Sequence, residues 1–207
     1  MIDLYLRDIP EKFEKGSELG DLIYQICLAY ITSFIFYFLV VYLKRVKDRQ
    51  ILEPYIADKT RTVIHSGKIL VKYLVSETGI RPQNFYPTEE ELSAMCSKVN
   101  PNSFVQGWAN LSWMGLFREY FLKSEKAINS IYEKMPFVES KLIRYLGDIQ
   151  NNPHYYTGEI RPYKMGNTDL SFKSMHLYQY LMIIKDLEKY AEKNLIGYRK
   201  LDIKLDK

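Results

Sequence analysis

Hydrophobic residues occur in this chain as one long unbroken run followed by several shorter stripes at helical spacing. The run covers residues 22–43, LIYQICLAYITSFIFYFLVVYL, and these 22 residues include no charged side chain. At about 1.5 Å of rise per helical residue the run extends roughly 33 Å, enough to cross a bilayer core of about 30 Å. Tyr24 and Tyr42 lie near its ends, where amphipathic rings favour the headgroup layer. The pattern predicts a single transmembrane helix over 22–43.

Two other interpretations of the run are open. A buried helix of a soluble protein can be apolar on all sides, although such runs are usually shorter. A cleaved signal peptide requires a basic n-region and small residues at the cleavage site. Residues 1–21 instead contain six acidic and three basic side chains, and no A-x-A-like site follows the run. We therefore expect a retained membrane anchor.

Beyond the run, apolar residues recur every three or four positions and predict helices over about 55–77, 88–98, 113–135, 137–149 and 171–195. Gly79 and Pro136 are expected to end the first and third of these, and Thr88 with Glu91 has the spacing of a capping box. The positions expected to face inward in the four longest stripes are Ile56, Val63, Gly67, Leu70 and Leu74; Trp113, Leu116, Phe117, Tyr120, Phe121, Ala127, Ile128 and Ile131; Val138, Leu142, Tyr145, Leu146 and Ile149; and Leu177, Leu181, Ile184, Leu187, Ala191 and Leu195.

These elements predict an all-α fold, with one N-terminal transmembrane helix followed by a cytoplasmic helical bundle of about four main helices. Pro54 fits either the first turn of a new helix or a kink in a continuing one, so continuity with the span is left open. Residues 151–169 are expected to be the longest irregular stretch. The expected divisions are an extracytoplasmic segment 1–21, the span 22–43, a basic juxtamembrane segment 44–54, the helical domain 55–197 and a charged tail 198–207, which could be a short strand or disordered.

Basic residues directly after the run predict its orientation. Lys44, Arg45, Lys47 and Arg49 form a membrane-surface cluster, and lysine and arginine are retained on the cytoplasmic side. We therefore expect a protein of the cell (inner) membrane with its N-terminus outside and its C-terminal domain in the cytoplasm. Two cysteines, one in the span and one in the domain, suit a reducing compartment because they cannot pair within one chain.

Composition narrows the expected partners. A hydrophobic fraction of 47% with 14% aromatic residues excludes a disordered chain. The net charge of +4 is modest and much of it lies in the juxtamembrane cluster, where topology and anionic headgroups account for it. The lipid bilayer is thus an expected partner, whereas nucleic acid is not.

One face of the predicted span carries small and polar side chains. Gln25, Ala29, Thr32 and Ser33 fall at i, i+4, i+7 and i+8, and membrane helices approach one another through such faces. The glutamine amide also needs partners in hydrocarbon, unless it reaches headgroup water. We expect self-association through this face and hence a homo-oligomer. Alternatively, the hydroxyl groups bond their own backbone and the face contacts lipid.

Residues suited to catalysis or metal binding are not clustered in the sequence. The three histidines and two cysteines have neither i, i+4 nor C-x-x-C spacing. Phosphate-loop, dinucleotide and nucleophile-elbow motifs are also missing from the sequence. We therefore predict no catalytic residue, no metal and no cofactor.

Aromatic and basic residues alternate in one stretch that has binding character. Planar or phosphate-bearing ligands could stack on such rings while the cations take the charge. The candidate ligand-binding residues are Tyr155, Tyr156, Arg161, Tyr163 and Lys164. Arg81, Asn84, Phe85 and Tyr86 form a second loop of this kind. Alternatively, both loops simply cover the end of the bundle.

Three functions remain open on these observations. The first is an interaction or scaffold module, anchored at the inner face of the membrane and bound to a protein partner. The second is an oligomeric membrane effector whose cytoplasmic domain senses a ligand and rearranges the span, for example in a bacterial defence or stress response. The third is a tethered enzyme, which would need an unusual site of tyrosine, arginine and carboxylates. The layout resembles that of small bacterial single-pass proteins, and we expect the first function rather than an enzyme.

Overall fold

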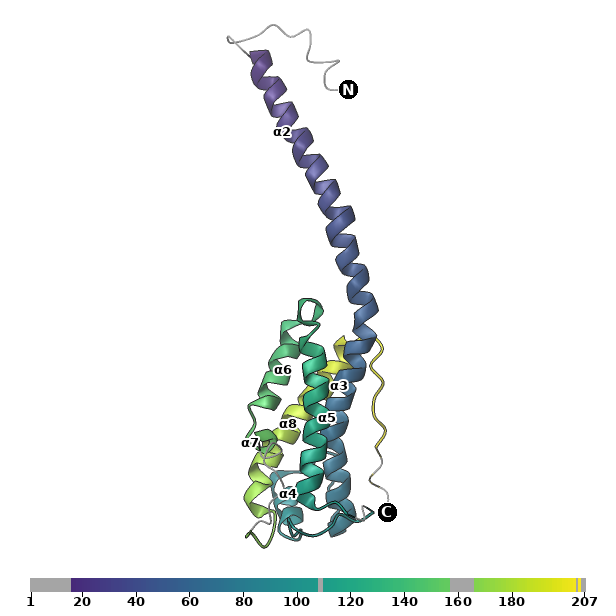
Figure 1. Cartoon of the computed structure of the whole chain (residues 1–207), viewed down its shortest axis with the longest axis vertical. Helices are drawn as coiled ribbons and strands as arrows, with labels where there is room; N and C mark the ends of the chain where they lie inside the picture. Colours follow the sequence, from purple (N-terminus) through teal and green to yellow (C-terminus); the bar gives the residue numbers. More distant parts are fainter. Residues whose placement is uncertain (1–15, 108–109, 157–165, 204, 206–207) are drawn as a thin grey trace. The chain divides into compact units, whose positions relative to one another are not determined.

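The computed structural model describes residues 16–107, 110–156, 166–203 and 205, and within these ranges the chain is all-α (Figure 1). The one isolated strand-type bridge among the described residues joins Phe104 to Ser112. The chain divides into two compact units, the first ending at Arg49 and the second beginning at Gln50.

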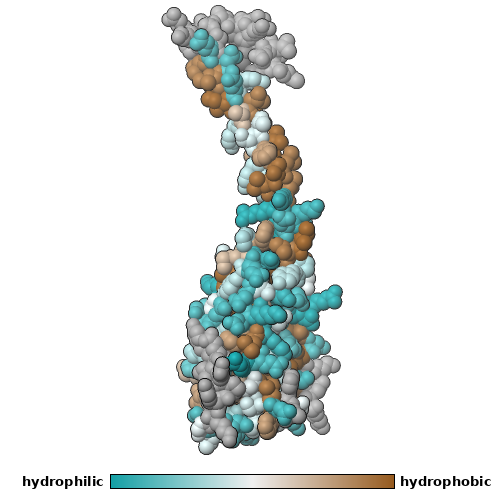
Figure 2. All heavy atoms as spheres, in the orientation of Figure 1, coloured by the Kyte–Doolittle hydropathy of each residue, from teal (hydrophilic) through white to brown (hydrophobic). Residues whose placement is uncertain are grey.

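The first unit carries the apolar run on exposed helix. It contains α2 (Gly16–Phe36), the π-helical segment η1 (Tyr37–Tyr42) and the first residues of α3 (Leu43–Thr78). Every residue from 22 to 43 is exposed, and Figure 2 shows brown, hydrophobic side chains along α2. A single described helix, Glu18–Thr78, is long and apolar enough to cross a membrane, and no residue of its most apolar stretch is buried. Helical conformation thus continues from the run into the following segment, and Pro54 lies inside α3.

A widened turn interrupts the α-helical pattern within the run. The N–H of Leu43 donates to the carbonyl of Phe38, the i→i−5 bond of a π-helix. The rings of Phe34, Phe38 and Tyr42 stack in a row through this turn, with centroids 6.5 and 5.5 Å apart. The sequence stripe did not predict this turn, because hydrophobicity alone does not distinguish α from π geometry.

The second unit is a helical bundle built from the predicted stripes. Its longer helices are α3, α5 (Trp113–Tyr132), α6 (Ser140–Gln150) and α8 (Ser171–Asn194). The shorter elements are α4 (Glu89–Cys96), the 3₁₀ turn η2 (Met135–Phe137) and α7 (Pro153–Tyr156). α8 contacts α4, α6 and α7. The predicted inward-facing positions are buried, except that Val138, Tyr145 and Leu195 are half-buried.

Helix ends follow the capping chemistry of the sequence. The Thr88 hydroxyl accepts from the N–H of Glu91, and the Glu91 carboxylate accepts from the N–H of Thr88, which confirms the capping box. Gly79 follows the last residue of α3 with φ +68°, the left-handed conformation that ends a helix at little steric cost. The predicted stop of this helix is therefore also confirmed.

Two stretches are more structured than expected. α7 lies inside the predicted irregular stretch 151–169. The tail does not form a strand in its described part, which we call the C-terminal segment (residues 198–203 and 205). It is extended, runs beside α3 in Figure 1, and packs Tyr198, Leu201 and Leu205 against the core. Its sequence is too polar for the packing to be recognised from hydrophobicity.

α3 and α8 approach each other closely at Gly67. A Cβ atom built there would lie 2.9 Å from Cγ1 and 3.1 Å from Cγ2 of Ile184. Because a β-branched side chain is stiff at χ1, Ile184 cannot easily move away. The sequence therefore has to keep a side chain off this position for the two helices to meet.

Gly67→Ala should lower the free energy of unfolding by about 1–3 kcal/mol, because the added methyl group overpacks the α3–α8 contact. Urea denaturation of the full-length protein in detergent, followed by tryptophan fluorescence, measures the change. Gly147→Ala in α6 is the matched control, since a Cβ there meets no atom within 4 Å. The control should stabilise by up to about 1 kcal/mol through helix propensity. Equal effects of the two substitutions would contradict the close approach.

Candidate functional site

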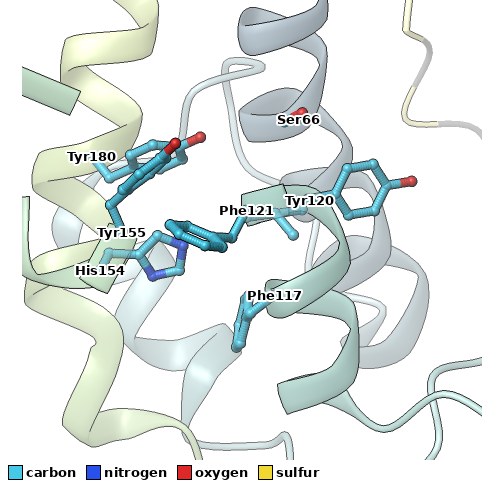
Figure 3. A pocket seen from close by; sticks show the side chains of 8 residues that line it. Ser66, Phe117, Tyr120, Phe121, His154, Tyr155 and Tyr180 are labelled. Carbon is cyan, nitrogen blue, oxygen red and sulfur yellow. The ribbon is translucent and has the colours of Figure 1, made fainter. Parts of the chain in front are cut away.

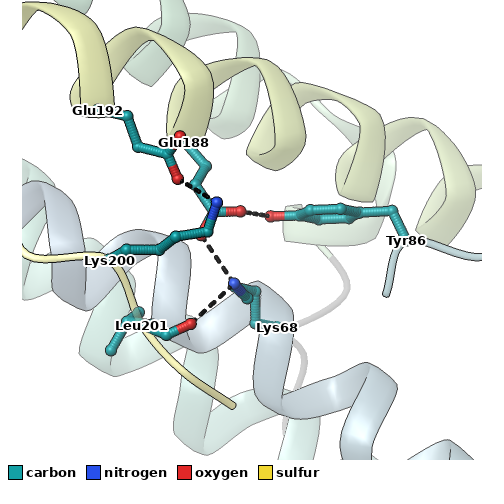
Figure 4. Close-up of polar contacts among 6 residues, drawn as sticks. All are labelled: Lys68, Tyr86, Glu188, Glu192, Lys200 and Leu201. Carbon is teal, nitrogen blue, oxygen red and sulfur yellow. Dashed lines mark hydrogen bonds and ion pairs between the residues drawn. The ribbon is translucent and has the colours of Figure 1, made fainter. Parts of the chain in front are cut away.

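A buried polar cluster is centred on an ion pair between α3 and α8. The Nζ of Lys68 donates to Oε1 of Glu188 at 2.7 Å, and the two side chains are only 5% and 7% exposed (Figure 4). Nζ also donates to the carbonyl oxygen of Leu201 at 3.2 Å. The ammonium lies over the ring of Phe85, 4.6 Å from the centroid. The Nζ of Lys68 thus contacts a carboxylate, a carbonyl oxygen and the face of an aromatic ring.

The carboxylate of Glu188 has a second partner from the loop 79–88. The Tyr86 hydroxyl donates to Oε2 at 2.7 Å. Burial, followed by this hydrogen bond, raises the pKa of Tyr86 above its ordinary value. The hydroxyl therefore stays protonated and keeps donating. A buried charge pair is stable when its remaining donors and acceptors are satisfied, and here the lysine and the carboxylate each have additional partners.

An outer layer extends this cluster to the C-terminal segment. Lys200 pairs with Glu192 at 2.7 Å, one turn along α8 from Glu188. Burial, and then the charges of Glu188 and Glu192, raise the pKa of the Tyr198 hydroxyl. The cluster therefore joins α3, the loop 79–88, α8 and the C-terminal segment. This arrangement is that of a structural cluster, which holds the four segments together.

A second cluster of polar and aromatic side chains surrounds a small cavity. The cavity has a volume of about 10 Å³, the space of about one water molecule. Figure 3 shows His154 and Tyr155 of α7 facing Phe117 and Phe121 of α5. The His154 ring packs edge-on to Phe117 with centroids 5.2 Å apart, and Tyr155 packs in the same way on Phe121 at 4.6 Å. The cavity is too small for an organic ligand.

Burial determines the protonation of His154, which lines this cavity, and of Cys96 on α4. Burial, and then the charges of Lys173 and His176, hold the pKa of His154 well below its usual range. The pKa of the Cys96 thiol rises to about 12 because of burial and the charge of Asp169. At neutral pH the imidazole is therefore uncharged and the thiol is protonated, which makes Cys96 a poor nucleophile.

Lys173 is the other buried lysine among the described residues of the bundle. Burial lowers its pKa to about 8, and its Nζ lies 4.5 Å from the centroid of the Phe117 ring. It is 2% exposed on the first turn of α8. The amine therefore adds a positive charge to the side of the cavity that carries His154, and this charge opposes protonation of the imidazole.

The predicted ligand-binding loop is described only at its start. Tyr155 is buried, 6% exposed, and belongs to the core. Tyr156 is the last residue of α7. Arg161, Tyr163 and Lys164 lie outside the described residues. In the second loop, Phe85 and Tyr86 contribute to the Lys68–Glu188 cluster, whereas Arg81 and Asn84 are exposed.

The predicted membrane residues are all exposed on the first unit. Gln25, Ala29, Thr32 and Ser33 lie on α2, and the Thr32 hydroxyl donates to the carbonyl of Leu28 at 2.8 Å. A hydroxyl group that bonds its own backbone needs no second helix, which agrees with the alternative that this face contacts lipid. Self-association through this face therefore stays a prediction. Lys44, Arg45, Lys47 and Arg49 are exposed on the first turns of α3.

Sequence reasoning did not find the Lys68–Glu188 pair, although a signal for it exists. Lys68 lies in line with the buried Ile64, Val71 and Val75 of α3. Glu188 likewise follows Leu181 and Ile184 on the buried face of α8. One basic and one acidic residue, each interrupting an otherwise apolar stripe, indicate a buried pair when the two helices are neighbours.

No family model, no curated protein and no solved structure matches the chain. Among the described residues, no group of three or more histidine, cysteine, aspartate or glutamate side chains is arranged to hold a metal ion.

Lys68→Met should reduce the free energy of unfolding by about 3–5 kcal/mol, because it leaves the buried Glu188 carboxylate without its cation. Adding Glu188→Gln should restore much of this loss, since the amide oxygen can still accept from Tyr86. Urea denaturation of the two single variants and the double variant measures the coupling.

The matched control is Lys189→Met, which breaks the exposed pair with Asp186 on the same helix. Its cost should lie between about 0 and 1 kcal/mol. Additive effects of Lys68→Met and Glu188→Gln would contradict the pairing of the two buried charges.

Proposed function

We propose that this chain is a single-pass membrane protein whose helical bundle acts as an interaction module at the inner face of the cell membrane. The observation that carries the proposal is the apolar stretch of α2 and η1, which lies on exposed helix and has no described side chain packed over it. Leaving so many large apolar side chains in water would be costly, whereas a bilayer solvates them.

The distribution of charge supports the orientation. Lys44, Arg45, Lys47 and Arg49 are exposed directly after the run, whereas Glu18 and Asp21 precede it. Positive residues are retained on the cytoplasmic side, so the bundle that begins at Gln50 belongs there. Anionic headgroups would add to the retention.

Exposed apolar side chains on the bundle support binding to a protein. Phe172 and Met175 of α8 are 40% and 55% exposed and lie one turn apart, so they share one face of the helix. Aromatic residues and methionine are enriched at protein interfaces.

Cysteine accessibility in intact cells tests the orientation. In a Cys27→Ser background, Glu18→Cys should react with a membrane-impermeant maleimide, and Lys126→Cys should react only after permeabilisation. Both positions are exposed on their helices. Replacing Lys44, Arg45, Lys47 and Arg49 by glutamine should give mixed labelling, because the retention signal is removed. Reaction of Lys126→Cys in intact cells would overturn the topology.

Capture with the full-length protein tests the interaction. We expect a protein partner from the cells that produce the chain to co-purify in mild detergent. Recovery should fall about tenfold for Phe172→Ser with Met175→Ser, equivalent to about 1.4 kcal/mol of binding.

The control for this capture is Leu122→Ser with Met135→Ser, which removes exposed apolar side chains from α5 and η2. An equal loss with both pairs would contradict a role for the α8 face. Recovery of nothing but further copies of the chain would favour the oligomeric effector, which uses the same span with the Gln25 face as its contact.

A further inference from the structure

Three exposed apolar side chains lie together at the end of the bundle where the chain enters it. Ile51 and Tyr55 are one helical turn apart on α3 and are 65% and 38% exposed. Ile196, 68% exposed, follows the end of α8. The next residue, Gly197, passes so close to α3 that a Cβ there would lie 3.6 Å from Cα of Pro54. Ile196 therefore lies beside the turn of α3 that carries the other two. We call Ile51, Tyr55 and Ile196 the entry patch.

Basic side chains surround the entry patch. Lys193 and Arg199 flank Ile196 along the chain, and both are exposed. Lys59 places its ammonium 5.2 Å from the centroid of the Tyr55 ring. The apolar side chains of the patch thus have cations on both the α3 side and the α8 side.

The acidic side chains of the same region are mostly paired. Glu192 forms an ion pair with Lys200 at 2.7 Å, and Asp58 lies 3.8 Å from Lys59. Glu53 is half-buried on α3. The membrane-surface cluster, directly before the patch in the chain, adds four bases and is interrupted by one acid. Bases therefore outnumber acids around the patch, which suits an anionic surface.

The chain connects this patch to the apolar run over a short distance. The run ends at Leu43, and Ile51 follows eight residues later. Eight helical residues extend about 12 Å, whereas the headgroup layer is about 5–8 Å thick on each side of a bilayer. A helix that leans from the membrane normal therefore carries the patch to the headgroups. Because the connection is short, the patch meets the bilayer surface at a far higher effective concentration than it meets a freely diffusing partner.

Pro54 allows the bundle to lean. A proline has no N–H, so the carbonyl oxygen of Gln50 lacks its helical donor, and helices bend at such positions. Gln50 is also the first residue of the second unit. A bend at this position would tilt the bundle toward the bilayer surface.

We propose that the entry patch docks on the cytoplasmic surface of the bilayer, so that the bundle lies against the membrane that anchors it. Ile51 and Ile196 enter the boundary between headgroups and acyl chains, and the Tyr55 ring lies at headgroup level, where tyrosine is enriched. Lys193 and Arg199 contact the phosphates of anionic lipids. The inference rests on the proposed function, because it requires the run to span the bilayer, and it adds the surface of the bundle that faces the membrane.

Fluorescence quenching of the full-length protein in vesicles of phosphatidylcholine and phosphatidylglycerol tests the docking. In a Cys27→Ser background, Asn194→Cys places a fluorophore next to the patch, and Gln179→Cys places one about 22 Å away on the same helix. Both positions are exposed, whereas the remaining Cys96 is buried. With a quencher on the lipid headgroups, we expect quenching at Asn194→Cys to be several-fold stronger than at Gln179→Cys.

Ile51→Ser with Ile196→Ser should reduce quenching at the probe next to the patch to the level of the distant probe, because the apolar anchors are removed. The matched control, Leu122→Ser with Met175→Ser, removes two exposed apolar side chains elsewhere on the bundle and should leave the quenching unchanged. Quenching in vesicles of phosphatidylcholine alone should be weaker, since the bases lose their anionic partners.

Equal quenching at the two probes would overturn the docking, and so would strong quenching that survives Ile51→Ser with Ile196→Ser. Quenching next to the patch that falls as the vesicles contain more protein would assign the patch to a second copy instead. Unchanged quenching in phosphatidylcholine alone would overturn the part assigned to Lys193 and Arg199.

A fluorophore on the native Cys27 tests the span separately. Cys27 is exposed on α2, so quenchers on the acyl chains reach it if the run crosses the bilayer, whatever the bundle does. Quenching at Cys27 without quenching next to the patch would reject the docking and keep the proposed membrane anchor. No quenching at Cys27 would reject the anchor itself.

Discussion

One buried pair of charges connects four segments of the bundle. Removing two ions from water is unfavourable unless they meet each other and find further partners. Lys68 and Glu188 do so with help from the Tyr86 hydroxyl and the Leu201 carbonyl. Two helices, a loop and the C-terminal segment must therefore be in place together. Hydrophobic burial brings these segments together, and in this arrangement the two buried charges find their partners.

The two units of the chain differ in how their apolar side chains are covered. In the bundle, apolar stripes of several helices cover one another and line a cavity of about 10 Å³. In the first unit the apolar residues surround a helix and are exposed in the chain itself. A bilayer would serve there as the core does in the bundle. The sequence pattern thus changes from apolar residues on all sides of the helix in the first unit to an apolar stripe on each helix of the bundle.

Much of the fold follows from local rules that need no tertiary information. The stripes of α5 and α8, the Thr88 capping box and the stop at Gly79 depend on residues within a few positions of each other. The Lys68–Glu188 pair joins residues 120 positions apart, so it appears only when α3 and α8 are known to be neighbours. α7 could not be predicted because it is short and lies among residues that favour loops. The packing of the tail could not be predicted because it depends on isolated leucines that form no stripe. The membrane and ligand-binding residues remain predictions, because the described geometry does not test lipid, ligand or partner.

Adjacent residues of α3 fix its register against α8 in two independent ways. Gly67 allows contact with Ile184, and Lys68 bonds Glu188, one turn further along α8. Sliding the helices by one turn, about 5.4 Å, would drive side chains into the close contact and separate two buried charges. A slide of α3 along α8 by one turn is therefore strongly disfavoured. Any rearrangement of the bundle that keeps both contacts would move residues 50–78 of α3 together with α8.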